Sequence, residues 1–275
     1  MIRGDGDGWV ELADGTRRWG LFGAAGLLLH AADAAGTGHV LLQHRALWSH
    51  MGGTWGVPGG ARDSGESSLQ AALREFGEEV AGPLDGALPS AVHRQDHTVW
   101  TYDTVFAQLP ELRAYSRGNT ESAEIRWVPV EKVPSLKLLP AFAATWPLLL
   151  SALDRRLVLV VDARGTTRDP APLRDALAEA ARTGIESALL PQVPRLMALH
   201  RWFPRVRLLV PRPGLAPAPG VEVAAGDAAP GPPAPEGTAE LVLTDDPDLR
   251  AAHTERGAVG APLGLLDTLI GAPRP

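Results

Sequence analysis

Three glutamates stand at helical spacing in the segment that follows a glycine-rich loop. The stretch from Ser67 to Val80 carries apolar residues at the period of a helix, so Glu75, Glu78 and Glu79 share one face of it. Unpaired carboxylates this close repel one another, and a hard cation such as Mg²⁺ or Mn²⁺ relieves the repulsion. Such an ion also binds phosphates and lowers the pKa of a coordinated water. The triplet therefore predicts metal-assisted chemistry on a phosphate.

The residues around the triplet distinguish it from an ordinary solvated acidic face beside Arg74. Gly60 is followed after five residues by Glu66, and after seven more by Arg74-Glu75, then Phe76 and Glu78-Glu79. Six fixed residue types at such spacings coincide by chance in a chain of this length with a probability on the order of 10⁻⁵. The pattern resembles the signature of the Nudix hydrolase family, and the resemblance covers residues 20 to about 150.

The resemblance implies both a fold and a reaction. The fold is an α/β/α sandwich that contains a loop-helix-loop motif. The reaction is cleavage of a pyrophosphate linkage in a nucleoside di- or triphosphate, with Mg²⁺ (or Mn²⁺) as cofactor. Two substrate classes stay open, namely oxidised nucleoside triphosphates such as 8-oxo-dGTP and nucleoside diphosphates linked to another group. The alternative function is a non-catalytic nucleotide-sensing protein that keeps the motif.

Family roles, carried over residue by residue, divide the motif into ligands and architecture. The implied metal ligands are Glu75, Glu78 and Glu79, with Glu75 or Glu79 also a catalytic base. The structural and phosphate-loop positions are Gly59, Gly60, Glu66 and Arg74. The family motif ends in glycine and an apolar residue, whereas this chain has Ala81-Gly82. We expect a shifted helix end, with Gly82 available in the left-handed conformation and the ligands intact.

Further candidate site residues lie outside the motif. The segment Thr120–Pro129 resembles one in which many Nudix enzymes hold another catalytic carboxylate, and Glu121 is the candidate there, with an exposed loop glutamate as the alternative. The candidates for substrate binding are Arg45, Trp55, Tyr102 and Trp127. A planar guanidinium suits a phosphate, and aromatic rings stack on a base. Solvent exposure of the arginine and core packing of each ring are the competing interpretations.

The first half of the chain also predicts the elements that position these residues. A hairpin is expected from the apolar runs Ala24 to His30 and His39 to His44 and the turn residues between them. Leu69, Ala72, Leu73 and Phe76 predict the helix that carries the glutamates, and strands are expected at His97 to Gln108 and Glu124 to Val130. Pro140 and Pro147 flank a predicted short helix, and a Nudix domain is expected over residues 1–153.

The second half, residues 154–275, predicts a smaller accessory α/β domain with an open, Rossmann-like sheet. The expected strands are Arg156 to Val161, Val206 to Val210 and Ala239 to Thr244, and the expected helices contain Leu173 to Ala180, Pro247 to Arg256 and Leu263 to Ile270. Pro211 to Pro219 and Ala228 to Pro235 are expected to be loops, because they are rich in proline, glycine and alanine.

Acidic residues follow two of these expected strands. Asp162 follows the first, and Thr244-Asp245-Asp246 follows a later one, at the sheet edge where open α/β sheets bind ligands. The arrangement weakly resembles the PIN-like or NYN ribonuclease fold, whose acidic cluster binds metal. Asp245 or Asp246 can equally cap the helix that starts near Pro247. We interpret this half as a degenerate, structural or partner-binding domain rather than an active nuclease.

Composition limits the kinds of partner and site. The chain has 275 residues, no cysteine and a formal charge of −6. Without cysteine, metal ligands are limited to oxygen and imidazole. The scattered basic residues give no nucleic-acid footprint, so we expect a small nucleotide substrate. The acidic, glycine-rich start and the short apolar runs predict neither export nor a membrane span, so we expect a cytoplasmic protein, with a homodimer left open.

Overall fold

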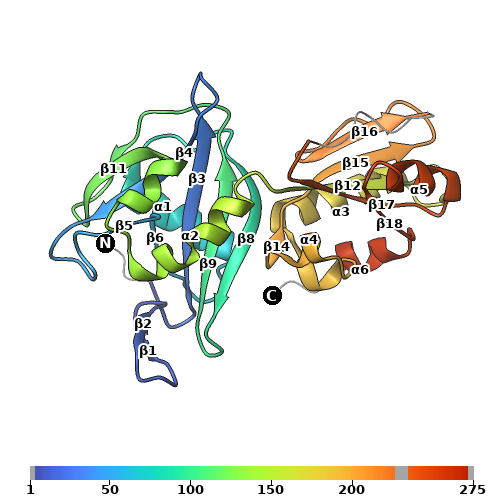
Figure 1. Ribbon diagram of the computed structural model, residues 1–275. Helices are drawn as coiled ribbons and strands as arrows, with labels where there is room; N and C mark the ends of the chain where they lie inside the picture. The colour runs from blue at the N-terminus through green and yellow to red at the C-terminus, as the bar shows by residue number, and fades with distance from the viewer. Residues whose placement is uncertain (1–3, 227–234, 272–275) are drawn as a thin grey trace. The chain divides into compact units, whose positions relative to one another are not determined.

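The computed structural model describes residues 4–226 and 235–271, and these form two compact units that divide between Leu153 and Asp154 (Figure 1). Both units combine helices and sheets, as the predicted α/β class requires. Residues 1–3 and residues 228–234 of the expected loop lie outside the described residues. No helix in the described part of the chain is long and apolar enough to cross a membrane.

The first unit is built on a sheet whose strands run in the order β11-β4-β3-β9-β8. Their bounds are β3 (Ala24–Ala32), β4 (Gly38–Arg45), β8 (Leu88–Asp96), β9 (Thr101–Gln108) and β11 (Ser122–Pro129). Strand β3 pairs antiparallel with β4 and parallel with β9, and every residue of it except the last is buried. A strand covered on both faces needs such a continuous apolar run. The core of this unit therefore centres on β3.

Short strands complete the unit and bring the glycine-rich loop onto the central strand. They are β1 (Trp9–Glu11) with β2 (Arg17–Trp19), β5 (Trp55–Gly56) beside β4, β6 (Gly59–Ala61) beside β3, and β7 (Val80–Ala81) with β10 (Ser116–Arg117). In β6, Gly59 and Gly60 lie opposite Gly26 and Ala25. A Cβ atom on Gly59 would overlap the backbone of β3, so only glycine allows this close approach.

Helix α1 (Ser68–Glu79) carries the three glutamates and contacts β3, β6 and β9. A capping box starts it: the hydroxyl of Ser67 accepts from the backbone nitrogen of Gln70, and the side-chain oxygen of Gln70 accepts from the backbone nitrogen of Ser67. Ala71, Ala72 and Phe76 are buried, whereas Leu73, which was expected on the apolar face, is 37% exposed. The buried face of α1 therefore includes Ala71 rather than the expected Leu73.

The expected role of Gly82 as the left-handed end of this helix is wrong. The helix ends at Glu79, and its C-cap Val80 is already extended, because Val80 and Ala81 pair with β10. Gly82 comes after that pairing with a φ of 151°, where a Cβ atom would overlap the ring of Tyr115. Glycine is therefore required by the backbone conformation that follows strand β7, and not by a helix cap.

The prolines near the end of the first unit do not bound a short helix. Helix α2 runs over Pro140–Ala152 and contains Pro147 in its interior, after the short 3₁₀ helix η1 (Val130–Ser135). Pro140 at the first turn costs no hydrogen bond. Phe142, Trp146 and Leu149 form a buried stripe along the helix that continues on both sides of Pro147. Packing of that stripe outweighs the cost of Pro147.

The second unit is an open parallel sheet with strand order β16-β15-β12-β17-β18. Its strands are β12 (Arg156–Asp162), β15 (Arg205–Val210), β16 (Val221–Ala225), β17 (Thr238–Leu243) and β18 (Val259–Ala261), with a small pair β13 (Ile185–Glu186) and β14 (Arg201–Trp202). Its helices are α3 (Pro170–Thr183), η2 (Ser187–Leu189), α4 (Pro194–Met197), α5 (Pro247–Thr254) and α6 (Leu265–Gly271). The chain adds strands outward from β12 on one side and then continues at β17 on the other. The strand order therefore reverses between β12 and β17.

Phe76 anchors α1, so its truncation should loosen the helix that carries the glutamates. Phe76 is 1% exposed and meets Tyr115 edge-on at 5.8 Å between ring centroids. We expect Phe76→Ala to lower the free energy of unfolding of the first unit by about 3–5 kcal/mol, measured by urea denaturation. Leu73→Ala, on the exposed side of the same helix, should change it by about 0.5 kcal/mol or less. Equal losses in the two variants would contradict the packing described.

Candidate functional site

The guanidinium of Arg74 joins the glycine-rich loop to α1. Its Nε and Nη2 donate to the two oxygens of Glu66 at 2.8 and 3.0 Å, and Nη2 also donates to the backbone oxygen of Ala61 at 2.8 Å. Its Nη1 donates to Glu75 at 2.8 Å and to Glu78 at 3.3 Å. Bidentate pairs of this kind fix geometry as well as charge. One side chain thus holds the loop and two of the three glutamates.

Glu79 turns from the helix toward the sheet and is 4% exposed. The amide of Gln43 donates to its Oε1 at 2.9 Å, and the backbone nitrogen of Gly59 donates to its Oε2 at 2.8 Å. The same Gln43 nitrogen donates to the hydroxyl of Ser122 at 2.8 Å. Burial raises the pKa of Glu79 to about 7, although these donors act in the opposite direction. The carboxylate is therefore rigidly held but short of positive charge.

Glu75 lies against the loop at Gly60. A Cβ atom on Gly60 would overlap its carboxylate, so the glycine leaves the space that this side chain fills. Burial raises the pKa of Glu75 to about 7, and the hydrogen bond from Arg74 only partly offsets this effect. Two neighbouring carboxylates are thus kept from water with too few opposite charges, which is an environment that stabilises a bound cation.

The three glutamates do not converge on one point in this arrangement. Glu78 has a side chain that is 49% exposed and reaches only Arg74, while Glu75 and Glu79 turn inward. Among residues 4–226 and 235–271, no group of three or more His, Cys, Asp or Glu side chains is arranged to hold a metal ion. The predicted face is present, but Arg74 and Gln43 draw its carboxylates in different directions.

Glu121 and Arg45 lie beside this cluster. Glu121 directly precedes Ser122, whose hydroxyl shares the amide of Gln43 with Glu79. Ser122 is also the register partner of Arg45 across strands β11 and β4. Arg45 is close enough to act electrostatically on Glu79. The structure thus brings both sequence-predicted residues to the same end of the site.

The three aromatic candidates differ in their surroundings. Trp55 is 6% exposed, stacks on His44 at 4.7 Å and lies 4.6 Å below the guanidinium of Arg126. Trp127 is half-buried and donates from its indole nitrogen to a backbone oxygen at 2.8 Å. Tyr102 lies beside β3, and its pKa is raised by burial and then by the charge of Glu79. Tyr102 is the ring among these three that adjoins the glutamates, while both tryptophans contribute to packing.

Asp103 in β9 is a fully buried carboxylate that the sequence reasoning missed. Arg94 on β8 donates to its two oxygens at 2.8 and 2.7 Å, and Arg62 of the loop lies 3.6 Å from Oδ2. The hydroxyl of Ser68, the first residue of α1, donates to the same oxygen. Asp103 therefore ties the loop and the start of the helix to the sheet.

Gln43, like Asp103, was not singled out from the sequence, although each is a polar residue within an apolar strand. Both residues interrupt apolar runs, after Leu41-Leu42 in one strand and before Val105-Phe106 in the other. A polar side chain that is buried in a strand requires a partner. An inward polar residue at such a position is therefore a candidate for supporting a site.

Comparisons with known proteins agree on the first unit. The family model described as NUDIX domain matches residues 23–149, which lie wholly within that unit. "Putative 8-oxo-dGTP diphosphatase 3" of Mycobacterium tuberculosis is 51% identical over 158 residues, which cover 55% of this chain and 72% of that protein. A "Nucleoside triphosphate pyrophosphatase/Nudix hydrolase fusion protein" of Bifidobacterium longum is 45% identical over 153 residues, covering 54% of this chain and 32% of that one.

A solved structure gives the same result. The crystal structure of a Nudix hydrolase from M. smegmatis, RenU, is 46% identical, with a TM-score of 0.50. The match covers 53% of this chain and 93% of that one. At this identity the likeness includes the sequence as well as the fold.

Asp103 should be important for stability because it is the shared partner of two arginines. Asp103→Asn leaves Arg94 and Arg62 without their buried counter-charge, so we expect a loss of about 3–5 kcal/mol in the free energy of unfolding of the first unit. The measurement is urea denaturation. Asp96→Asn, in the same hairpin but exposed, should lose no more than about 1 kcal/mol. A tolerated Asp103→Asn would show that the arginines have other partners.

Proposed function

The chain belongs to the Nudix hydrolase family, and on that premise we propose that it hydrolyses oxidised purine nucleoside triphosphates with Mg²⁺ as its cofactor. The observation that carries the proposal is the pair formed by the buried carboxylate of Glu79 and the half-buried one of Glu75, held by Arg74, Gln43 and the backbone of Gly59. The substrate class is supported by the 51% identity to a protein named as an 8-oxo-dGTP diphosphatase.

The residues present fit a divalent cation. The pKa values of Glu75 and Glu79 are raised by burial to about 7, so a cation would stabilise the charged forms of both. The oxygen Oε1 of Gln43 is also buried, and no described residue hydrogen-bonds to it. Glu75 and Glu79 would hold the ion, and Glu78 would join them once its side chain turned away from Arg74. When bound, it would neutralise charge on the phosphates and lower the pKa of a coordinated water.

The chain's own residues supply positioning and a base. Both oxygens of Glu79 accept hydrogen bonds, so this carboxylate is preorganised. Glu75 donates nothing and accepts from Arg74 at Oε1, while Oε2 takes part in no hydrogen bond from the described residues. Glu75 is therefore better placed than Glu79 to accept the proton of the attacking water. Glu121, which precedes Ser122 on the Glu79 side of the site, is the candidate for a further catalytic carboxylate.

Substrate contacts are assigned by position and chemistry. Arg45, beside Glu79, supplies a planar guanidinium for a phosphate oxygen. The phenol of Tyr102 supplies a hydrogen-bond donor close to Glu75 and Glu79. Trp55 packs between His44 and Arg126, and Trp127 packs against Tyr115, so both are weaker candidates for stacking on the base.

The decisive experiment measures turnover of a substrate panel by the full chain with Mg²⁺. The panel contains dGTP, 8-oxo-dGTP, ADP-ribose, NADH and a nucleotide sugar. We expect the highest kcat/KM for 8-oxo-dGTP, with release of the nucleoside monophosphate and pyrophosphate. Glu75→Gln and Glu79→Gln should lower kcat by about 10²- to 10⁴-fold. Glu131→Gln, exposed on η1, should leave it unchanged.

Each result of this panel has a distinct meaning. If ADP-ribose or a nucleotide sugar has the highest kcat/KM, the substrate proposal is wrong and the hydrolase assignment stands. If the wild type and both variants turn over every compound equally slowly, catalysis by this site is ruled out. Binding of a labelled nucleotide without turnover would then identify the non-catalytic sensor.

Gln43 should act through Glu79. Gln43→Leu removes the side-chain donor that orients Glu79, so we expect the Mg²⁺ concentration for half-maximal activity to rise by about 10- to 100-fold. The measurement is a Mg²⁺ titration of EDTA-treated protein. Gln95→Leu is the matched control, because its amide donates to Thr145 at 2.9 Å and not to the glutamates. Identical titrations for both variants would refute the role of Gln43.

A further inference from the structure

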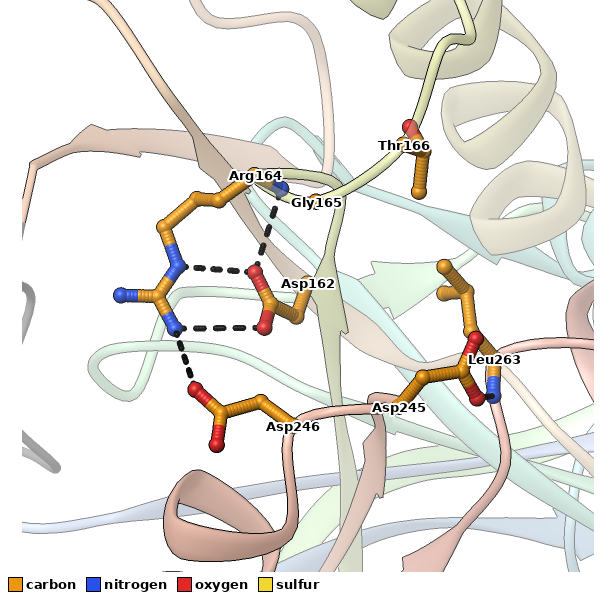
Figure 2. A pocket seen from close by; sticks show the side chains of 7 residues that line it. All are labelled: Asp162, Arg164, Gly165, Thr166, Asp245, Asp246 and Leu263. Atoms are coloured by element: carbon orange, nitrogen blue, oxygen red, sulfur yellow. Dashed lines mark hydrogen bonds and ion pairs between the residues drawn. The ribbon is translucent and has the colours of Figure 1, made fainter.

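The second unit has its own pocket, of about 360 Å³, at the carboxyl edge of its sheet (Figure 2). It is lined by Asp162, Arg164, Gly165, Thr166, Asp245, Asp246 and Leu263. Asp162 ends β12 and Thr244 follows β17, so the pocket lies where the strand order reverses. Open α/β sheets bind their ligands in that crevice. Three acids and one arginine line this crevice, so its function depends on whether a metal ion or the arginine balances the charge of the acids.

The carboxylate of Asp162, which is the buried acid of the pocket, already accepts hydrogen bonds at both of its oxygens. Asp162 is 6% exposed, and the guanidinium of Arg164 donates to its Oδ1 at 2.8 Å and its Oδ2 at 3.2 Å. The backbone nitrogen of Arg164 donates to Oδ1 at 3.2 Å, and the hydroxyl of Thr244 donates to Oδ2 at 2.8 Å. Both oxygens thus accept two hydrogen bonds each. A metal ion could bind only after Arg164 had moved away.

The other two acids do not complete a cluster. Figure 2 shows their side chains pointing apart, Asp246 toward Arg164 and Asp245 toward Leu263. Asp246 caps α5 through Oδ1 and places Oδ2 3.9 Å from the guanidinium of Arg164. Asp245 accepts from the backbone nitrogen of Leu263 at 3.0 Å. The two acids therefore have structural partners, and Arg164 lies between Asp162 and Asp246 where a shared cation would sit.

Charge compensation separates this pocket from the glutamates of the first unit. Burial raises the pKa of Asp162, but the hydrogen bonds from Arg164 and Thr244 outweigh it, so the pKa lies below its usual value. The pKa values of Glu75 and Glu79 are instead raised to about 7. Asp162 thus already has its counter-charge, because the guanidinium of Arg164 contacts both of its oxygens.

We propose that Arg164 is the built-in cation of the second unit's pocket, so that this pocket binds its ligand without a divalent metal. The acidic residues that suggested a metal-binding ribonuclease site are, on this view, the counter-charges of an arginine. The guanidinium cannot dissociate and is charged at every physiological pH. Metal-dependent cleavage of nucleic acid is therefore not the activity of this unit.

The first test counts Mn²⁺ ions bound per full-length chain, from the electron paramagnetic resonance signal of free Mn²⁺. Asp162→Asn should leave the count at the wild-type value, as should the control Asp175→Asn, whose carboxylate pairs with Arg174 on the exposed side of α3. A count lowered by one in Asp162→Asn alone would overturn the proposal. So would Mn²⁺-dependent cleavage of single-stranded RNA that Asp162→Asn abolishes.

The second test removes the proposed cation. Arg164→Met leaves the buried Asp162 without its partner, so we expect one additional Mn²⁺ per chain and slower hydrogen exchange in β12 and β17 when Mn²⁺ is added. Arg168→Met is the matched control, because Arg168 pairs with the exposed Asp267 at 2.7 Å. If Arg164→Met binds no additional Mn²⁺, and Mn²⁺ does not change hydrogen exchange in β12 and β17 of this variant, the proposal that Arg164 replaces a metal ion is wrong. If that variant fails to fold, the Asp162→Asn count still decides.

Discussion

The hydrogen bonds from Arg74 to Glu66, Glu75 and the backbone of Ala61 hold the glycine-rich loop against α1. Because the loop is fixed there, Gly60 lies against the carboxylate of Glu75, and Gly59 presents its backbone nitrogen to Glu79. The close contact of β6 with β3 depends on Gly59 as well, because a Cβ atom there would overlap the backbone of β3. Arg74 and the space at Gly60 therefore set the position of Glu75, while Gly59 and Gln43 set that of Glu79.

Three carboxylate sites among the described residues, all wholly or partly buried, show different degrees of charge compensation. Asp103 faces two arginines and serves as a structural tie. Asp162 is matched by Arg164 within its own loop. Glu75 shares Arg74 with Glu66 and Glu78, whereas Glu79 accepts from the neutral amides of Gln43 and Gly59. Burial raises the pKa of both Glu75 and Glu79. Electrostatic interactions out of water are strong, so an uncompensated pair is costly unless a cation binds. The least compensated site is the one suited to metal-assisted chemistry.

The sequence predicted the parts of this structure that depend on local pattern. The hairpin of β3 and β4, the helix with its glutamates and the open sheet of the second unit all follow from periodicity and turn residues. Gln43 and Asp103 could not be paired with Glu79 and Arg94 in advance, because those contacts join strands and helices far apart in the chain. The end of α1 was misjudged because Val80 and Ala81 are drawn into a strand pair with residues more than 30 positions away. Similarly, packing of Phe142, Trp146 and Leu149 overrides the breaking tendency of Pro147.

The two units meet the same electrostatic requirement in different ways, and this has a consequence for how each responds to its surroundings. A divalent cation at Glu75 and Glu79 would exchange with solution, so occupancy of that site follows the free concentration of the ion. Arg164 is part of the chain, and the charge that it gives to Asp162 is independent of any ion. On the proposed function, a change in the available divalent metal would therefore alter hydrolysis in the first unit, while the second pocket would keep its charge pattern. A ligand of that pocket must complement a fixed guanidinium between two carboxylates, which favours groups that accept and donate hydrogen bonds over groups that require a bridging metal.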